Sequence, residues 1–337
     1  MLPQILATHA ARDAWIVALI GTIVELVVLF IALTVLVKLR DTDIYSAARK
    51  DFKIVGAKFI VLLMLFLFIL QLLILLKQIF YLLQTQMFEN LSFRNFAIPM
   101  LTLGIFFCFF PARSIFRSGE IFWVFIIVAI AISIIPAVGQ IRPWEVLPIF
   151  NRGAGPIWSG VYRNLIYFES ASFLLIFAGD IKVEQNFRKK FMTLAILVGA
   201  SFVLFVFMFY ALFGPMSSTK TIAIANLTLY SSFFSNTGSM DWVLVSIWLL
   251  LLTMRFGVTF FCAFSCLRYI TAIKHRAGIL GASLGIAIYL LLTLVFRNMT
   301  ELDSFIYHAA PAIVSLYILI PLSFYIFTLR KGGKKNA

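Results

Sequence analysis

The chain has 337 residues, of which 62% are hydrophobic and only 12% are charged, and its mean hydropathy is +1.02. A soluble domain of this length cannot hide so much apolar surface in its core, so this class of protein is excluded. The formal charge of +14 does not indicate a nucleic-acid binder, because the basic residues lie in short gaps between apolar runs. The composition therefore predicts a polytopic integral membrane protein, all-α, with residues 1–337 forming a single membrane domain.

Nine apolar segments are long enough to cross a membrane, some of them with tilt. We expect full spans at about 14–37, 54–83, 96–112, 119–138, 158–180, 189–212, 240–273, 278–297 and 306–329. Residues 1–12 are too short to cross and lack the features of a signal peptide, so we expect a partial first helix on the outer side. Arg113 and Arg117 are expected in a tight turn between the third and fourth spans.

Two connecting segments differ from the others in composition. The loop 139–157 is rich in Gly and Pro, which favours a short re-entrant or interfacial piece. The loop 214–239 is rich in Ser, Thr and Asn and carries little charge. We expect it to lie outside the membrane, with a short helix around 221–229.

Lysine and arginine concentrate in alternate connections, which is the pattern of cytoplasmic loops. The basic set places positions 49 and 331, and with them the C-terminus, in the cytoplasm. Four tryptophans fall near the opposite boundary, where an aromatic belt is expected: Trp15, Trp144, Trp158 and Trp242. Nine spans would leave Met1 outside. A further helix before Met1 would place both termini in the cytoplasm, and we expect the native gene to encode one.

The fifth segment, WSGVYRNLIYFESASFLLIFAGD at 158–180, carries an acid near its middle. Glu169 lies roughly 16 Å along a helix from Trp158, close to the midplane of a hydrocarbon core about 30 Å thick. An ionisable group there costs at least ~2.5 kcal/mol on insertion scales, which indicates a protein interior or a wet cavity and hence a functional site. The alternative is a protonated packing residue that is hydrogen-bonded to a neighbouring helix.

The neighbours of Glu169 suit a ligand-binding pocket. Tyr167 and Phe168 supply aromatic surface, and Ser170 and Ser172 supply small hydroxyls. Together they predict a partly wet pocket for a small zwitterion or cation. An unbroken helix would place Leu165, Glu169 and Ser172 on one face, since these residues are three to four positions apart.

Four further stretches carry recognisable motifs: LPQILATHAARDAW at 2–15, ARSIFRSGEIFW at 112–123, IYFESASFLLIF at 166–177 and ALFGP at 211–215. They resemble the GerAB family of spore germination proteins. The first is similar to the end of that family's helix 1 and its entry into helix 2, and the second to the link between helices 4 and 5. The third is similar to the acid motif of helix 6, and the fourth to the end of helix 7. The order and spacing of these stretches fit the whole chain.

The resemblance implies an amino acid, polyamine and organocation permease-like (LeuT-like) bundle of ten helices in two inverted repeats. Binding sites in such folds are built where helices 1 and 6 break. The fifth segment corresponds to helix 6. Two departures matter: the pattern's helix 1 break would precede the first residue of this sequence, and no Gly or Pro flanks Glu169.

The other polar residues inside the spans have simpler interpretations. Lys58 and Arg268 are close enough to span ends to extend to the inner surface. Gln71 also lies within a span. We interpret the deeper set as ion-paired or hydrogen-bonded packing residues rather than substrate contacts: Glu25, Lys77 and Arg255. GASLG at 281–285 is a small-xxx-small pattern typical of close helix contact.

Catalytic patterns are missing from the sequence. It has no P-loop, no nucleophile–base pair and no cofactor motif, and its three cysteines and three histidines lack metal-ligand spacing. An enzyme is therefore not expected.

The resemblance predicts a membrane subunit of a spore germinant receptor, which senses a small nutrient such as an amino acid and acts with A-type and C-type receptor subunits. It implies a location in the inner spore membrane or the cell membrane. The alternatives are a secondary transporter of amino acids or organic cations, and a structural partner without a ligand site.

Overall fold

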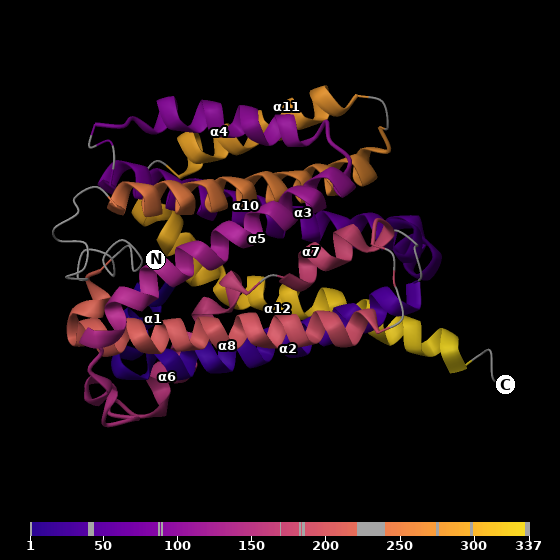
Figure 1. Cartoon of the computed structure of the whole chain (residues 1–337). Helices are drawn as coiled ribbons and strands as arrows, with labels where there is room; N and C mark the ends of the chain where they lie inside the picture. The colour runs from indigo at the N-terminus through magenta and orange to yellow at the C-terminus, as the bar shows by residue number, and fades with distance from the viewer. Residues whose placement is uncertain are drawn as a thin grey trace. The chain divides into compact units, whose positions relative to one another are not determined.

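The computed structural model is helical, and no strand occurs among the residues it describes (Figure 1). The described residues are 2–39, 44–86, 88, 90–168, 170–181, 183, 186–220, 240–273, 276–296 and 299–333. The all-α class predicted from composition is confirmed. The short helix expected around 221–229 and the side chain of Trp242 lie outside the described residues.

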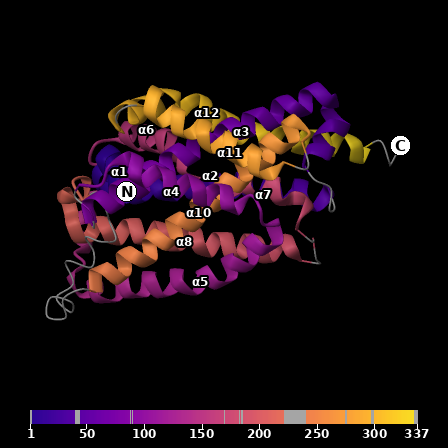
Figure 2. The same ribbon diagram turned by 90° about the horizontal axis from the view of Figure 1, so that it is seen from above.

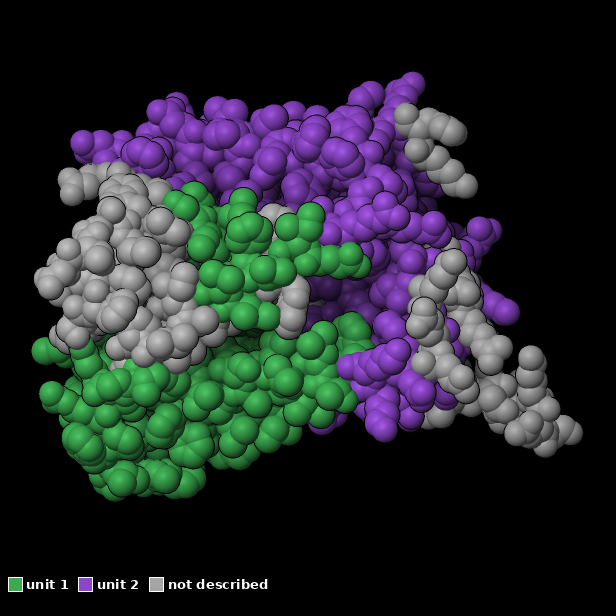
Figure 3. Space-filling view, in the orientation of Figure 1, with its two compact units in different colours: residues 1–26, 119–168, 191–251 green, residues 27–118, 169–190, 252–337 purple. Residues whose placement is uncertain are grey.

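The chain forms two compact units, each built from three separate stretches (Figure 3). Unit 1 comprises residues 1–26, 119–168 and 191–251. Unit 2 comprises residues 27–118, 169–190 and 252–337. Some long helices contribute residues to both units. Examples are α2 (Ala14–Leu39) and α8 (Phe187–Phe213).

Unit 1 is organised around the beginning of the chain. Its elements are α1 (Leu2–Ala10), the 3₁₀ turn η1 (Ala11–Asp13), the first half of α2, most of α5 (Ala112–Ile134), η2 (Ile135–Gln140), η3 (Pro143–Val146), α6 (Ala154–Asn164), η4 (Leu165–Tyr167), most of α8, η6 (Gly214–Ser218) and the start of α10 (Met240–Thr271). The short helix α1 packs against α6 and η6. Gly160 of α6 lets α1 and α2 come close to this helix, since a methyl group at Gly160 would lie 3.2 Å from Val17 and 3.6 Å from His9.

Unit 2 holds the remaining helices. They are α3 (Ile44–Gln86), α4 (Phe93–Phe107), α7 (Ser170–Ile176), η5 (Phe177–Gly179), the rest of α10, α11 (Ala277–Leu290), the π-turn η7 (Leu291–Val295) and α12 (Met299–Gly333). α3 and α12 lie side by side (Figure 2). α11 packs on α4 through its glycines: methyl groups at Gly281 and Gly285 would lie 3.4 Å from Cys108 Sγ and 3.3 Å from Ile105 Cδ1. The close helix contact predicted for GASLG is confirmed.

Six of the described helical segments are long and apolar enough to cross a membrane. They are Leu2–Lys38, Phe52–Thr85, Phe187–Ser218, Val245–Thr271, Ala277–Val295 and Ser304–Ile326. A seventh is added if Phe93–Phe107 and Ala112–Ile121, which are bent by 117° at their junction, count as one span. The predicted number of nine stays a prediction.

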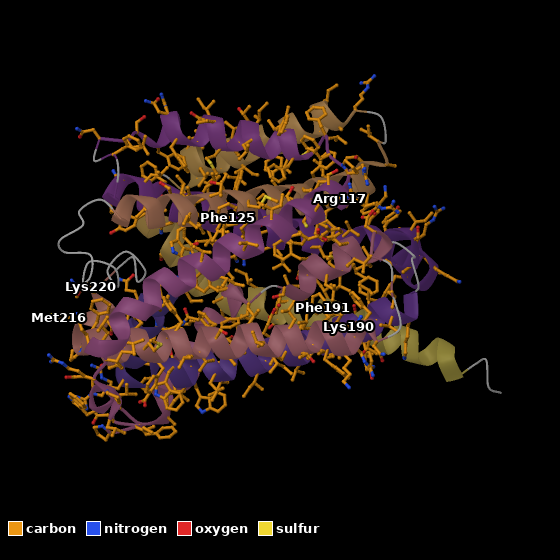
Figure 4. The ribbon with its side chains drawn as sticks, viewed as in Figure 1. Arg117, Phe125, Lys190, Phe191, Met216 and Lys220 are labelled. Atoms are coloured by element: carbon orange, nitrogen blue, oxygen red, sulfur yellow. The ribbon has the colours of Figure 1, made fainter. Side chains whose placement is uncertain are left out.

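One local prediction about a basic connection was wrong. Arg113 and Arg117 lie on the first turns of α5 rather than in the turn before it. Figure 4 shows Arg117 on this helix. The helix starts directly after Pro111, whose fixed φ favours a helix beginning. The basic link before the second span is also helical from Ile44, and it is broken only at Lys53, where φ is 62° and ψ is 179°.

Candidate functional site

The helical path of the fifth apolar segment is interrupted near its centre. α6 ends at Asn164, η4 covers Leu165–Tyr167, and α7 begins at Ser170. Phe168 has non-helical dihedrals (φ −107°, ψ 82°), and its N–H bonds to Leu165 O at 3.0 Å. The unbroken helix considered from the sequence is therefore wrong, and Leu165 and Ser172 do not share a face of one helix.

A buried amide precedes this interruption. The Asn164 side chain donates from Nδ2 to Gly160 O at 2.7 Å, so it bonds the carbonyl four residues back within α6. Asn favours such local side-chain bonds over regular helix. The tighter 3₁₀ turn of η4 follows directly, as is common at helix ends. This explains how a break forms without Gly or Pro.

The predicted site residues divide between the two units. Tyr167 and Phe168 belong to unit 1 and are half-buried. Ser170 is exposed and Ser172 is buried. Both lie on the first turn of α7, in unit 2. Glu169 lies outside the described residues, and its role stays a prediction.

Phe168 is held by two neighbours in unit 1. Its ring meets Phe202 of α8 edge-on at 6.0 Å between centroids. A methyl group at Gly21 of α2 would lie 2.8 Å from the Cζ of Phe168, which is closer than side-chain carbons approach one another. The missing side chain of Gly21 thus lets the ring pack directly on the α2 backbone.

α2 and α8 run antiparallel and in close contact. The ring of Trp15 meets that of Phe207, with centroids 6.1 Å apart, and seven residues further along α2 Thr22 contacts Gly199 of α8. The Cγ2 of Thr22 fills the space that a side chain at Gly199 would need. A glycine at this position allows the two helix backbones to approach closely.

The buried face of α2 carries two polar residues to which the sequence analysis gave no functional role. Glu25 is only 9% exposed and Thr22 only 8% exposed, so neither faces lipid. The hydroxyl Oγ1 of Thr22 is buried and has no hydrogen-bond partner within the described chain. In the sequence, Glu25 stood out as a deep acid, but nothing marked Thr22 apart from its place one turn before that acid.

The remaining intramembrane polar residues lie in unit 2. Lys58 and Arg268 are exposed, as their predicted extension to the surface requires. The Arg268 guanidinium lies 5.9 Å from the ring centres of Phe264 and Tyr269. Gln71 is buried, Lys77 is half-buried and Arg255 is exposed. Arg255 therefore does not fit the interpretation of a deep packing residue.

A second polar cluster ties α1 and η1 to the loop before α6. The buried carboxylate of Asp13 accepts from Phe150 N–H at 3.0 Å, and Arg12 donates to Leu147 O. Gln4 Nε2 donates to Ser218 O of η6 at 3.0 Å. These bonds fix the start of the chain in unit 1, and the loop 139–157 is thereby an ordered part of this unit.

The potential metal-ligating side chains of the described residues do not cluster. No group of three His, Cys, Asp or Glu side chains among these residues is arranged to hold an ion. None of the three cysteines forms a disulfide, and all three are buried.

One of three comparisons with known proteins agrees with the resemblance noted from the motifs. A search of the curated proteins and a search of the solved structures each found no match. A family model described as "Spore germination protein" matches residues 1–302. The matched region includes the interrupted segment, both polar clusters and most of the helices. The chain is a helical integral membrane protein and belongs to this spore germination protein family.

Proposed function

We propose that this protein is the membrane subunit of a spore germinant receptor and that it senses a small nutrient such as an amino acid. The observation that carries the proposal is the interrupted helix at 164–170 in a member of the spore germination family. Broken helices within membranes expose backbone groups and helix ends, and these are the groups that permease-like proteins use to bind charged small molecules.

The proposed ligand-binding residues lie at the interruption or on the first turn of α7: Tyr167, Phe168, Glu169, Ser170 and Ser172. Glu169 would either contact an ammonium group or accept hydrogen bonds from backbone N–H groups released by the break. Phe168 supports the proposal because its ring is fixed against Gly21 and Phe202, so an aromatic wall stands at the break. Signalling would pass to A-type and C-type receptor subunits as partners.

Germination of spores carrying variants of Glu169 tests this function. In a strain with the full partner set, Glu169→Gln is expected to weaken the nutrient response strongly, because Gln keeps the shape but not the charge. Glu169→Leu is expected to abolish it. The matched control is Glu120→Gln, the same change at an exposed position of α5. Unchanged responses for both Glu169 variants at normal protein level would refute the site.

Transport is the competing function, and the same interrupted helix is compatible with it. Uptake of labelled amino acids into vesicles containing the purified protein separates the two. A sensor is expected to show no accumulation above protein-free vesicles, together with co-purification of receptor subunits from spore membranes. Concentrative uptake without such partners would favour the transporter.

A further inference from the structure

The buried face of α2 carries two polar residues one turn apart. Its buried positions follow helical spacing: Gly21, Thr22, Glu25, Val28 and Leu29. The exposed positions on the other face are apolar: Ile23, Val27 and Phe30. Residues three apart on a helix are neighbours on its surface, so Thr22 and Glu25 face the interior together.

The hydroxyl of Thr22 differs from those of seven other helical threonines of this protein. A threonine in a helix normally donates to the carbonyl four residues earlier. The hydroxyls that do so here, at 2.8–2.9 Å, are those of Thr8, Thr34, Thr85, Thr102, Thr259, Thr271 and Thr293. Thr22 instead packs its methyl group on Gly199, and within the described chain its buried Oγ1 has no partner.

Leaving a buried hydroxyl unsatisfied destabilises a fold, so such a group calls for an explanation such as an absent ligand. An acid inside a membrane protein is likewise a functional-site hypothesis. The two lie on one face of α2 near Gly21, on which the Phe168 ring packs: Thr22 is the next residue, and Glu25 is one turn after Gly21. Unit 1 therefore holds the Thr22 hydroxyl, the Glu25 carboxylate and the Phe168 ring at the same stretch of α2.

We propose that Thr22 and Glu25 bind the ammonium group of a small amine or amino acid, with Phe168 as the wall of the site. A carboxylate with a hydroxyl satisfies an ammonium donor, and an aromatic ring suits the carbon chain attached to it. A hard metal cation such as Ca²⁺ would need six or more oxygen ligands. This inference deepens the proposed function, on which it rests, by naming the residues that recognise the ammonium group, and it leaves Glu169 the role of accepting hydrogen bonds from backbone N–H groups at the break.

Methylammonium is the probe that tests the site directly. Thermal unfolding of the purified full-length protein in lipid nanodiscs is followed with increasing methylammonium chloride and, separately, with sodium chloride at equal ionic strength. A ligand that binds only the folded state raises the unfolding temperature in proportion to its saturation. Wild type is expected to be stabilised by methylammonium and not by sodium.

Two variants and two matched controls make the test specific. Thr22→Val keeps the shape and the methyl contact with Gly199 but removes Oγ1, so the protein without ligand is expected to be as stable as wild type. Its apparent Kd for methylammonium should rise about 5-fold, and that of Glu25→Gln about 10-fold or more. Thr34→Val removes a hydroxyl that is satisfied within its helix, and Glu120→Gln neutralises an exposed acid. Both controls should bind as wild type does.

The outcomes separate this inference from the proposed function. Equal stabilisation by sodium, or wild-type affinity in Thr22→Val and Glu25→Gln, would overturn the ammonium site. A wild-type protein that ignores methylammonium while spores still need this gene for their nutrient response would overturn only the site. Methylammonium binding that is weakened in Thr22→Val and Glu25→Gln, in a protein whose deletion leaves germination unchanged, would support the site and refute the germinant function.

Discussion

The carboxylate of Asp13 accepts a hydrogen bond from the backbone N–H of Phe150, which is 3.0 Å away and 137 residues further along the chain. Asp13 is buried, so solvent cannot replace this bond. The contact ties η1, at the start of α2, to the loop that leads into α6. Within unit 1, the segment before the interrupted helix is therefore anchored to the beginning of the chain.

Asp13→Ala should destabilise the protein by about 1–3 kcal/mol, since it removes the charged acceptor of a part-buried hydrogen bond. Asp13→Asn should cost less, because the amide oxygen still accepts. The measurement is the unfolding temperature of the purified protein in detergent. Asp180→Ala, which removes an exposed acid, is the control and should be neutral. Equal stability of Asp13→Ala and Asp180→Ala would contradict the anchoring role.

Gly21→Ala should impair the nutrient response at normal protein level. Its methyl group would lie 2.8 Å from the ring of Phe168, so the aromatic wall at the break must move. Overpacking of this kind costs about 1–3 kcal/mol, which offsets the helix-propensity gain of about 1 kcal/mol from replacing Gly. Gly119→Ala is the control, because nothing lies within 4 Å of its added methyl group. A normal response in Gly21→Ala spores would show that the position of Phe168 is not critical.

Gly285→Leu should separate α4 from α11 and lower the unfolding temperature, whereas Gly285→Ala should be tolerated. The reason is that a methyl group at Gly285 lies 3.3 Å from Ile105 Cδ1, which a small shift can relieve, while a larger side chain has no space. Ile286→Leu, on the exposed side of α11, provides the control. If Gly285→Leu and Ile286→Leu unfold at the same temperature, the contact does not contribute to stability.

Cysteine labelling in intact cells should find position 220 accessible to an impermeant reagent and position 49 protected, as the loop charges predict. Arg49 is exposed on the helix that starts at Ile44, so a cysteine there reports the side of the membrane rather than burial. The native cysteines are buried, which keeps the background low. Lysed cells are the control and should label both positions. Labelling of position 49 but not 220 in intact cells would invert the topology.

Local composition determined the class of this protein, the approximate course of its long helices and the segment that holds the candidate site. Hydropathy and length are properties of a short stretch of chain, so α8 and α10 begin and end within two residues of the expected limits. The contact formed by Gly281 and Gly285 could also be predicted from sequence, because small residues at that spacing in a membrane helix typically mark close packing on another helix.

Tertiary structure decided the features that depend on residues far apart in the chain. The break at 165–168 is not signalled by Gly or Pro. The direct packing of Phe168 on Gly21 needs α2, 147 positions earlier, to lie beside it. The Thr22 hydroxyl has no partner among the described residues, and the methyl group of the same side chain packs on Gly199 of α8, 177 positions later. Helix propensity and hydropathy are summed over neighbours in sequence, whereas close approach and the satisfaction of a buried polar atom are settled by which helices pack together.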